Sequence, residues 1–361
     1  MLGLNGMILA LSARDTASLG VGRIRVCPMK VQVYLLVTER CNLFCPHCIR
    51  KVKSTGNCDF SLDKLKFLLD CVDDLFKQHT YVISGGEPTL HPHFCEVIKQ
   101  IIKSESSVAI TTNGTNADSF VPLRADAKNI NVQVSLDGDR EAHDSIRGVG
   151  TFNLALKSIK DLLASGFPVT VASVVNKINV DSFFQLAETV SRLHIPSWSL
   201  SMEQAFTAEA KSRGLTTSEW NSFVDEIIKV ANVHVKIRKH FDFDLFEKME
   251  TKLGKERIAR CAIPNCGVGR TKVYIYPDGT VLPCTCLPEL AIGNIFTDDA
   301  ALIRTRFEGI RCDPLANSVC HTCRWKYFCN GGCPGHSLRR TGVVGLGDDR
   351  CPYVKNGVAF S

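Results

Sequence analysis

The stretch that decides the fold is VQVYLLVTERCNLFCPHC, residues 31–48, in which an apolar, strand-like run leads directly into three cysteines. These are Cys41, Cys45 and Cys48, with the spacing C-x3-C-x2-C. An iron–sulfur cube is normally held by four cysteine thiolates, so a loop that supplies three leaves one iron open. An open iron is a site for chemistry, whereas a fully ligated cube mainly transfers electrons. The alternative is a structural zinc with four closed ligands, which could include His47.

Strand-like runs alternate with amphipathic helical patterns after this loop. Candidate strands lie at residues 31–38, 80–85, 107–112, 131–136, 169–175 and 197–202. Ser61 is the predicted N-cap of the first helix. Six such units in series predict a parallel sheet covered by helices. Because six fall short of the eight units of a closed barrel, we expect an α/β fold with a partial (β/α)6 barrel that binds ligands at the carboxyl ends of its strands.

The composition shifts to cysteine, glycine and proline at Cys261, and a chain of 361 residues allows a large domain plus a smaller one. The hairpin pattern VYIYPDGTVLPC, residues 273–284, has a Pro-Asp-Gly turn that would deliver Cys284 from a rigid ribbon. The expected organisation is an N-terminal extension over 1–30, the partial barrel over 31–232, a bridging segment over 233–260 and a small Cys-rich α+β domain over 261–361.

Bulk composition excludes several classes of protein. Hydrophobic residues make up 45% and charged residues 22% of the chain, as in an ordinary globular protein. A net charge of +6 is too mild to indicate nucleic acid binding, and no apolar run is long enough to span a membrane. The 17 cysteines are odd in number, in a chain much longer than most disulfide scaffolds. Together with an N-terminus that lacks the basic region of a signal peptide, they favour metal binding in the cytoplasm.

Glycines and a carboxylate end the second predicted strand, in the turn Gly85-Gly86-Glu87-Pro88. Two glycines let the backbone come close to a ligand, and a carboxylate beside them can bind an ammonium group. Ser135 ends the fourth strand, and Arg147 follows shortly after it. Small polar groups at successive strand ends suit ribose hydroxyls and a carboxylate. The alternatives are an ordinary tight turn at the glycines and a surface salt bridge at Arg147.

The cysteine loop and the Gly-Gly-Glu-Pro turn together resemble the radical S-adenosylmethionine (SAM) enzymes. The resemblance implies that SAM occupies the open iron of the cluster on Cys41, Cys45 and Cys48. An electron from the cube would then split SAM to a 5′-deoxyadenosyl radical. The residues expected to contact SAM are Gly85, Gly86 and Glu87 at the methionine amine, Ser135 and Arg147, and Asn176 near the adenine.

A second cysteine set lies near the C-terminus. It reads Cys261-x4-Cys266-x12-Gly279-x4-Cys284, then Cys320-x2-Cys323-x5-Cys329-x3-Cys333, and finally Cys351. Eight cysteines suit two fully ligated four-iron clusters, for a total of three [4Fe-4S] clusters; two structural zincs are the alternative. The pattern resembles the SPASM domain, and this resemblance implies two ligand sets: Cys261, Cys266, Cys284 and Cys333 in one, and Cys320, Cys323, Cys329 and Cys351 in the other.

Enzymes with a SPASM domain mostly modify ribosomal peptides or proteins. The branch that matures sulfatases has an acid directly after the cysteine of the G-x4-C element, where this chain has Thr285. We therefore expect a peptide maturase that forms an oxidative C–C or thioether crosslink in a short precursor peptide. A flavodoxin- or ferredoxin-type reductant would supply the electron. Only about 30 residues precede the first strand, so a separate leader-peptide-binding protein is a further expected partner. The alternatives are an enzyme for a small-molecule or cofactor precursor, and a non-enzymatic iron–sulfur electron carrier.

Overall fold

The computed structural model describes residues 30–50, 58–105, 107–256, 258, 267–310 and 312–357. Two of the predicted cluster ligands, Cys261 and Cys266, lie outside the described residues, as does the N-terminal extension apart from Lys30.

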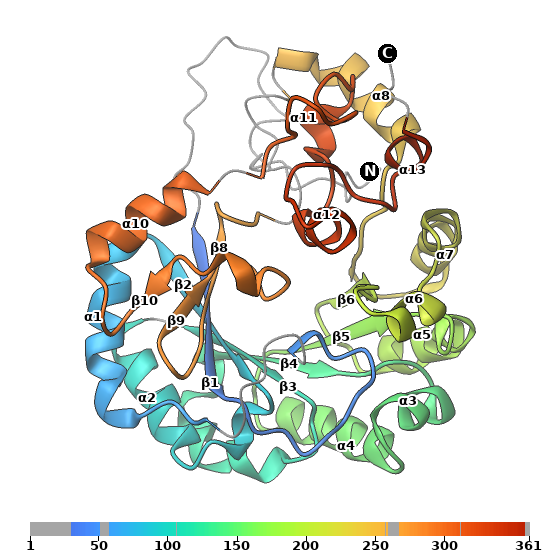
Figure 1. Cartoon of the computed structure of the whole chain (residues 1–361). Helices are drawn as coiled ribbons and strands as arrows, with labels where there is room; N and C mark the ends of the chain where they lie inside the picture. The colour runs from blue at the N-terminus through green and yellow to red at the C-terminus, as the bar shows by residue number, and fades with distance from the viewer. Residues whose placement is uncertain are drawn as a thin grey trace, which may run out of the picture.

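A ten-stranded sheet organises the described residues, in the order β10-β9-β8-β1-β2-β3-β4-β5-β6-β7 (Figure 1). Strands β1 to β7 follow chain order, and each pairs in parallel with the next. Six of them match the predicted strands closely, which confirms the expected α/β partial barrel. The strands are β1 Val31–Thr38, β2 His79–Gly85, β3 Val108–Thr112, β4 Ile130–Ser135, β5 Val169–Val175, β6 Trp198–Met202, β7 Val235–Lys236, β8 Lys272–Ile275, β9 Thr280–Leu282 and β10 Gly293–Asn294.

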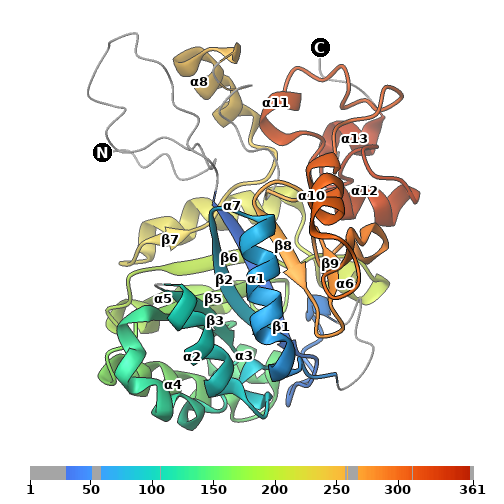
Figure 2. The ribbon, with the colours of Figure 1, turned by 90° about the vertical axis from the view of Figure 1, so that its left-hand side faces the viewer.

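Helices cover the outer face of this curved sheet (Figures 1 and 2). Their apolar sides and the alternating buried residues of the strands, such as Val33 and Leu35, form one large core. The helices are α1 Leu65–Leu75, α2 Phe94–Ser104, α3 Arg140–Arg147, α4 Thr151–Ala164, α5 Phe183–Arg192, α6 Ala208–Arg213, α7 Thr217–Val230, α8 Phe243–Leu253, α10 Ala300–Gly309, α11 Lys326–Cys329, α12 Pro334–Thr341 and α13 Pro352–Asn356.

Short 3-10 helices fill several connections, and they account for two departures from a regular (β/α) pattern. Ser61 precedes the 3-10 turn Leu62–Lys64 and makes no side-chain capping bond, so it does not cap α1 itself. The segment between β3 and β4 is the 3-10 helix Ala117–Asn129, in which Pro122 lacks the N–H that an α-helix needs.

The sheet continues beyond the six predicted units at both ends. The bridging segment contributes β7, which pairs with β6. The hairpin predicted over residues 273–284 forms as β8 and β9, and β8 also pairs in parallel with β1. Strands that follow residue 261 in the sequence therefore continue the sheet of the barrel, across the expected domain boundary. Pairing with β8 covers the edge of β1 that would otherwise expose a row of backbone groups.

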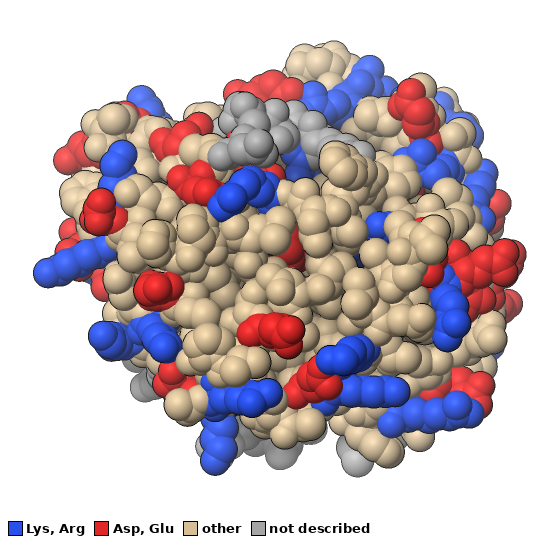
Figure 3. Space-filling model, turned by 90° about the horizontal axis from the view of Figure 1, so that it is seen from below, with Lys and Arg blue, Asp and Glu red and all other residues tan. Residues whose placement is uncertain are grey.

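Helices α11, α12 and α13 gather with α8 on one side of the sheet, whereas α10 packs beside α1 (Figures 1 and 2). Phe246 of α8 stacks on Phe328 of α11 with ring centroids 4.7 Å apart, and Met249 joins the same buried cluster. The bridging segment thus packs on the Cys-rich region. Among the described helices, none combines the length and apolar composition that crossing a membrane requires. Figure 3 shows basic and acidic side chains interspersed over one face of the molecule, without a broad field of one sign.

Candidate active site

A cavity of about 430 Å³ opens at the carboxyl ends of β2 to β6. Parallel strands bring their carboxyl ends to one edge of the sheet, where ligands of this fold class bind. The cavity collects side chains that lie far apart in the sequence. Eight of the nine site residues predicted in the barrel line it: Cys41, Cys45, Cys48, Gly85, Gly86, Glu87, Ser135 and Arg147.

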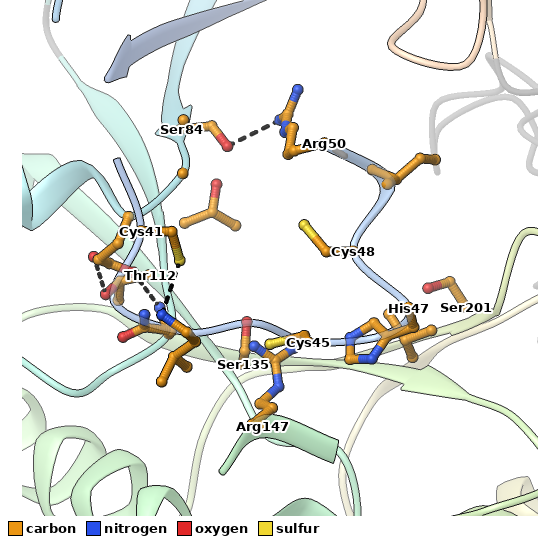
Figure 4. Close-up of a pocket in the computed structure, with 18 of the residues that line it drawn as sticks. Cys41, Cys45, His47, Cys48, Arg50, Ser84, Thr112, Ser135, Arg147 and Ser201 are labelled. Carbon is orange, nitrogen blue, oxygen red and sulfur yellow. Dashed lines mark hydrogen bonds between the residues drawn. The ribbon is translucent and has the colours of Figure 1, made fainter. Parts of the chain in front are cut away.

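The three cysteines of the first loop turn their sulfurs toward the same space (Figure 4). Cys45 is buried, whereas Cys41 is exposed and Cys48 is intermediate. Burial raises the pKa of the Cys41 and Cys45 thiols, and Arg147 partly opposes this rise at Cys45. Thiols in such surroundings become thiolates when a metal binds them. The loop therefore has the donor set and the open side that a cluster with one free iron needs.

The two glycines of the Gly85-Gly86 turn bring β2 against the start of the cysteine loop. A Cβ atom on Gly86 would lie 2.2 Å from the carbonyl oxygen of Arg40, and one on Gly85 would lie 2.3 Å from that of Thr38. The N–H of Gly86 donates to Thr38 O at 2.7 Å, and the N–H of Glu87 donates to Arg40 O at 2.8 Å. These N–H groups are therefore used to anchor the loop, and side chains larger than hydrogen would displace it.

Glu87 is almost completely buried beside the cavity. Its carboxylate accepts hydrogen bonds from the Thr112 hydroxyl at 2.7 Å, the Thr89 hydroxyl at 2.8 Å and the Asn113 N–H at 2.7 Å. Burial raises the pKa of Glu87, and these hydrogen bonds oppose the rise. The network fixes the carboxylate at the end of β3, on the cavity wall.

Arg147 forms a buried ion pair rather than the surface salt bridge considered above. Its Nε donates to Asp137 Oδ2 at 2.6 Å, and His47 Nε2 lies 3.2 Å from the same oxygen. The N–H of Val174 donates to the other oxygen at 2.7 Å. Burial disfavours the charged form of Asp137, but Arg147 and His47 outweigh it and hold its pKa well below the usual range. Asp137 thus orients a cation and an imidazole, those of Arg147 and His47, next to Cys45 (Figure 4).

Asn176 is the one predicted barrel residue that does not line the cavity. Its side-chain N–H donates to Glu203 Oε2 at 2.8 Å, and Arg213 donates to the other oxygen of Glu203 at 2.8 Å. Arg213 also donates to the carbonyl oxygen of Pro46, inside the cysteine loop, at 3.2 Å. In this arrangement Asn176 supports the loop through Glu203 and Arg213. A position at the end of a strand could not tell from the sequence whether Asn176 contacts SAM or supports the loop.

Arg50 is a site residue that the sequence analysis missed. It lines the cavity and donates from Nη2 to the Ser84 hydroxyl at 3.0 Å, while its Nη1 is buried without a hydrogen-bond partner in the described structure. His47 Nδ1, also on the cavity wall, is buried and without a partner there. Buried polar atoms are nearly always satisfied, so these two indicate a polar ligand. The sequence signal that could have identified His47 and Arg50 is their position, since both flank Cys48.

Phe44 lies in the cysteine loop, between Cys41 and Cys45. Its side chain is 85% exposed. Phe44 is absent from the residues that line the cavity, whereas Leu43 of the same loop lines it.

Four cysteines of the second set come together in the C-terminal region. Cys320 and Cys351 belong to one buried cluster. Burial, with added contributions from the thiols of Cys351, Cys320 and Cys323, raises the pKa of the Cys329 thiol to about 12. Burial likewise raises the pKa of Cys351 to about 11, with added contributions from Cys320 and Cys323. These four thiols, two buried and two partly exposed, thus lie close enough to interact electrostatically, as ligands of one metal cluster would.

Two further members of that set, Cys284 and Cys333, lie near Cys286. The N–H of Cys286 donates to Cys284 Sγ at 3.4 Å, and this residue lowers the pKa of Cys284 to about 7. A Cβ atom placed on Gly335 would lie 3.0 Å from the Cβ of Cys286 and 3.5 Å from Cys333 Sγ. Cys284 and Cys333 thus both lie close to Cys286. Of the cysteines outside both sets, Cys71 and Cys95 pack on the core.

Comparison with protein families gives two matches. The model of the Radical SAM superfamily matches residues 35–190, and that of SPASM, an iron–sulfur cluster-binding domain, matches residues 266–324. The two domains imply SAM and iron–sulfur clusters as cofactors.

Several curated proteins are similar over most of this chain. The antilisterial bacteriocin subtilosin biosynthesis protein AlbA of Bacillus subtilis is 30% identical over 81% of this chain and 62% of its own length. The mycofactocin maturase MftC of Mycobacterium tuberculosis is 27% identical over 82% of this chain and 76% of its own length. The AdoMet-dependent heme synthase of Methanosarcina barkeri is 25% identical over 88% of this chain and 95% of its own length. The chain therefore spans less than two thirds of AlbA.

The fold is also found in solved structures. Streptococcus suis SuiB bound to S-adenosylmethionine aligns with a TM-score of 0.74 at 19% identity, over 90% of this chain and 78% of that one. SuiB bound to its precursor peptide SuiA aligns with a TM-score of 0.71 at 19% identity, over 90% of this chain and 76% of that one. At this identity the likeness shows the fold alone.

Proposed function

Because the chain is a radical SAM protein with a C-terminal SPASM domain, we propose that it is a maturase that forms an oxidative crosslink, C–C or thioether, in a short precursor peptide. The observation that carries the proposal is the cavity in which three thiols meet the unpartnered atoms of His47 and Arg50. Two of the similar proteins, AlbA and MftC, are named for bacteriocin biosynthesis and for maturation.

The residues present fit a cluster and SAM. Cys41, Cys45 and Cys48 would hold the cluster, and the cavity beside them has room for a small ligand. When bound there, SAM and the cluster supply a 5′-deoxyadenosyl radical that removes a hydrogen atom from the substrate. The residues proposed to contact SAM are Gly85, Gly86, Glu87, Ser135 and Arg147, together with Arg50 from the structure. We assign Asn176 to positioning the cysteine loop.

The chain's own residues prepare this site by fixing charge and geometry. Arg147 places a cation beside Cys45 and offsets the negative charge of thiolates. Asp137 keeps that guanidinium in place and also holds His47, whose opposite ring nitrogen is buried without a hydrogen-bond partner in the described structure. Such prearranged dipoles and charges stabilise a bound ligand without reorganisation.

The C-terminal cysteines fit two further four-iron clusters, which makes three in all. One set is Cys320, Cys323, Cys329 and Cys351, whose thiols lie close to one another. The other is Cys284 and Cys333 with Cys261 and Cys266, of which the last two lie outside the described residues. We expect a flavodoxin- or ferredoxin-type protein as the electron donor, and a separate protein that binds the leader of the peptide.

The test is mass spectrometry of a short peptide encoded beside this chain, incubated anaerobically with the reconstituted protein, SAM and dithionite. We expect a product lighter by two hydrogens, with 5′-deoxyadenosine formed alongside. Fragmentation of the product would locate the crosslink. An unchanged peptide, even with a leader-binding protein from the same gene neighbourhood added, would contradict the proposed substrate class.

A second candidate function is the modification of a tetrapyrrole. It is supported by the similarity to the heme synthase, which extends over 95% of that protein's length. The same assay with an iron porphyrin in place of the peptide distinguishes the two candidates. A porphyrin product together with an unmodified peptide would favour this second function.

A further inference from the structure

A cluster of three ligand-type side chains lies at the opposite end of the barrel from the cysteine loop. Asp73 is near the end of α1, His79 is the first residue of β2, and Glu105 directly follows α2. One ligand atom of each residue lies within 4.8 Å of the others. The amino ends of the strands meet at this end, so the cluster takes no part in the site described above.

The ring of His79 points its Nε2 nitrogen at the two carboxylates. Its Nδ1 lies 2.8 Å from the carbonyl oxygen of Phe76. A carbonyl oxygen only accepts hydrogen bonds, so Nδ1 carries a proton, and Nε2 is the ring nitrogen that faces the carboxylates. A histidine ligand of a metal is commonly held in this way, with its other nitrogen donating to a backbone carbonyl. A cation held between Nε2 and the two carboxylates would satisfy all three groups.

The spacing of the ligand atoms fits a metal ion better than a shared proton. His79 Nε2 lies 3.3 Å from Glu105 Oε1 and 3.5 Å from Asp73 Oδ1. Charge-assisted N–H···O bonds are about 2.7–2.9 Å long, and Nε2 has no hydrogen-bond partner although it is buried. A tetrahedral zinc with bonds of about 2.0–2.2 Å separates its ligand atoms by roughly 3.3–3.5 Å.

The surroundings of the cluster give an ion access from solvent. They also leave a coordination position free for water. The side chain of His79 is 5% exposed, but that of Asp73 is 57% exposed and that of Glu105 is 26% exposed. Tyr81 packs edge-on against the His79 ring, and its buried hydroxyl has no hydrogen-bond partner in the described structure. The site therefore has a rigid inner wall and a solvent-facing carboxylate.

We propose that Asp73, His79 and Glu105 bind a divalent cation of the zinc type, through one imidazole nitrogen and two carboxylate oxygens, with water completing the coordination. Bound there, the ion ties the end of α1 to the end of α2 at the start of β2. It is a structural ion, separate from the iron–sulfur chemistry at the other end of the barrel.

The test uses the anaerobically purified holoprotein, titrated with zinc chloride and dialysed against zinc-free buffer. Zinc per chain is measured by inductively coupled plasma mass spectrometry, and its ligands by X-ray absorption at the zinc edge. We expect about one zinc per chain with a nitrogen and oxygen shell near about 2.0 Å. Zinc found only in a sulfur shell near about 2.3 Å would lie in cysteine sites and would overturn the proposal.

Variants on one helix provide the matched comparison. Asp73→Asn removes a ligand charge at an exposed position, and Asp74→Asn makes the same change at the neighbouring exposed residue, which is outside the cluster. Asp73→Asn should weaken zinc binding at least tenfold, whereas Asp74→Asn should bind as the parent does. Equal affinities in the two variants, or no retained zinc in the parent, would show that His79 forms an ion pair with its carboxylates instead.

Discussion

At the scale of single residues, Asp137 is the group on which the site most depends. It is completely buried and accepts hydrogen bonds from Arg147 and from the N–H of Val174. The pKa of Asp137 is held well below its usual range. The negative charge that stabilises the fold is therefore fully present at any pH above the ordinary pKa of a carboxyl group. It is lost only as the pH falls through the lowered value.

Asp137→Asn should destabilise the protein by about 3–5 kcal/mol, because it leaves the buried guanidinium of Arg147 without its counter-charge. Urea denaturation measures the loss. The double variant Asp137→Asn with Arg147→Met should recover part of it, since neither charge is then buried. If the double variant lost the sum of the two single losses, the two side chains would not be energetically coupled.

Cys48→Ala tests the open-iron site directly. We expect 5′-deoxyadenosine formation to fall below detection while the iron on the C-terminal cysteines is retained, because the two ligand sets lie in separate environments. Chromatography of the nucleoside and iron analysis of the protein measure the two effects. Cys58→Ala, at an exposed thiol outside both sets, is the control and should leave both unchanged. Nucleoside formation by Cys48→Ala at the parent rate would place the reacting cluster elsewhere.

Gly86→Ala tests whether the turn after β2 positions the cysteine loop. The added Cβ would lie 2.2 Å from the Arg40 carbonyl oxygen, which is backbone and cannot rotate away. We expect the loop to shift and SAM cleavage to fall at least a hundredfold, read from nucleoside formation. Gly309→Ala is the matched control, since nothing lies within 4 Å of its added Cβ. An active Gly86→Ala variant would mean that the loop tolerates this displacement.

At the scale of elements, the docking of β8 on β1 joins the Cys-rich region to the barrel. Val273 and Ile275 of β8 are completely buried. On the same pair of strands, Tyr34 and Tyr274 are aligned in register and stack with ring centroids 4.6 Å apart. Arg50, which lines the cavity, lies 5.7 Å from the centroid of the Tyr274 ring. The strand pair thus connects the cavity wall to the hairpin that carries Cys284.

A double-mutant cycle on Tyr34→Ala and Tyr274→Ala should give a coupling energy of about 0.5–1.5 kcal/mol, the usual range for a stacked aromatic pair. The free energies of unfolding in denaturant of the parent, both single variants and the double variant provide the cycle. Tyr34→Ala paired with Tyr327→Ala is the control, because these rings are not in contact in the described structure, and its changes should add. Additive losses for Tyr34 and Tyr274 would rule out the stacking contribution.

At the scale of the whole molecule, the buried histidines make stability depend on pH. His143 is completely buried, and its Nδ1 accepts the N–H of Asp137 at 3.0 Å. Burial, helped by Arg147, lowers the pKa of His143 to about 4, and burial also lowers the pKa of His240 well below its usual value. The folded state therefore holds both rings neutral, while the unfolded chain binds protons at an ordinary histidine pKa.

Stability should consequently fall as the pH drops from about 6.5 to about 4, by about 3 kcal/mol from His143. Above that window this contribution is fully present. His143→Asn keeps an acceptor for the Asp137 N–H and should flatten the dependence, as measured by urea denaturation at a series of pH values. His234→Asn, at an exposed position, should keep the slope of the parent. A parent-like slope in His143→Asn would assign the acid sensitivity to other groups.

The sequence by itself determined the strands of the barrel, the three-cysteine loop and both cysteine sets. These patterns depend on local spacing, because side chains alternate along a strand and a loop ligand set needs only neighbouring positions. Strands of two residues carry no such period, and for this reason β7 and β10 were not predicted. The hairpin of β8 and β9 was predicted from its turn, but its pairing with β1 was not.

Only the tertiary structure decided which distant residues meet. It placed Asn176 on the Glu203 and Arg213 network rather than on the cavity wall, and it buried the Arg147 ion pair. It also added Arg50 to the site and brought Glu105 to His79. The physical reason is that such contacts arise from strand order and helix packing over the whole sheet, which no local pattern in the chain specifies.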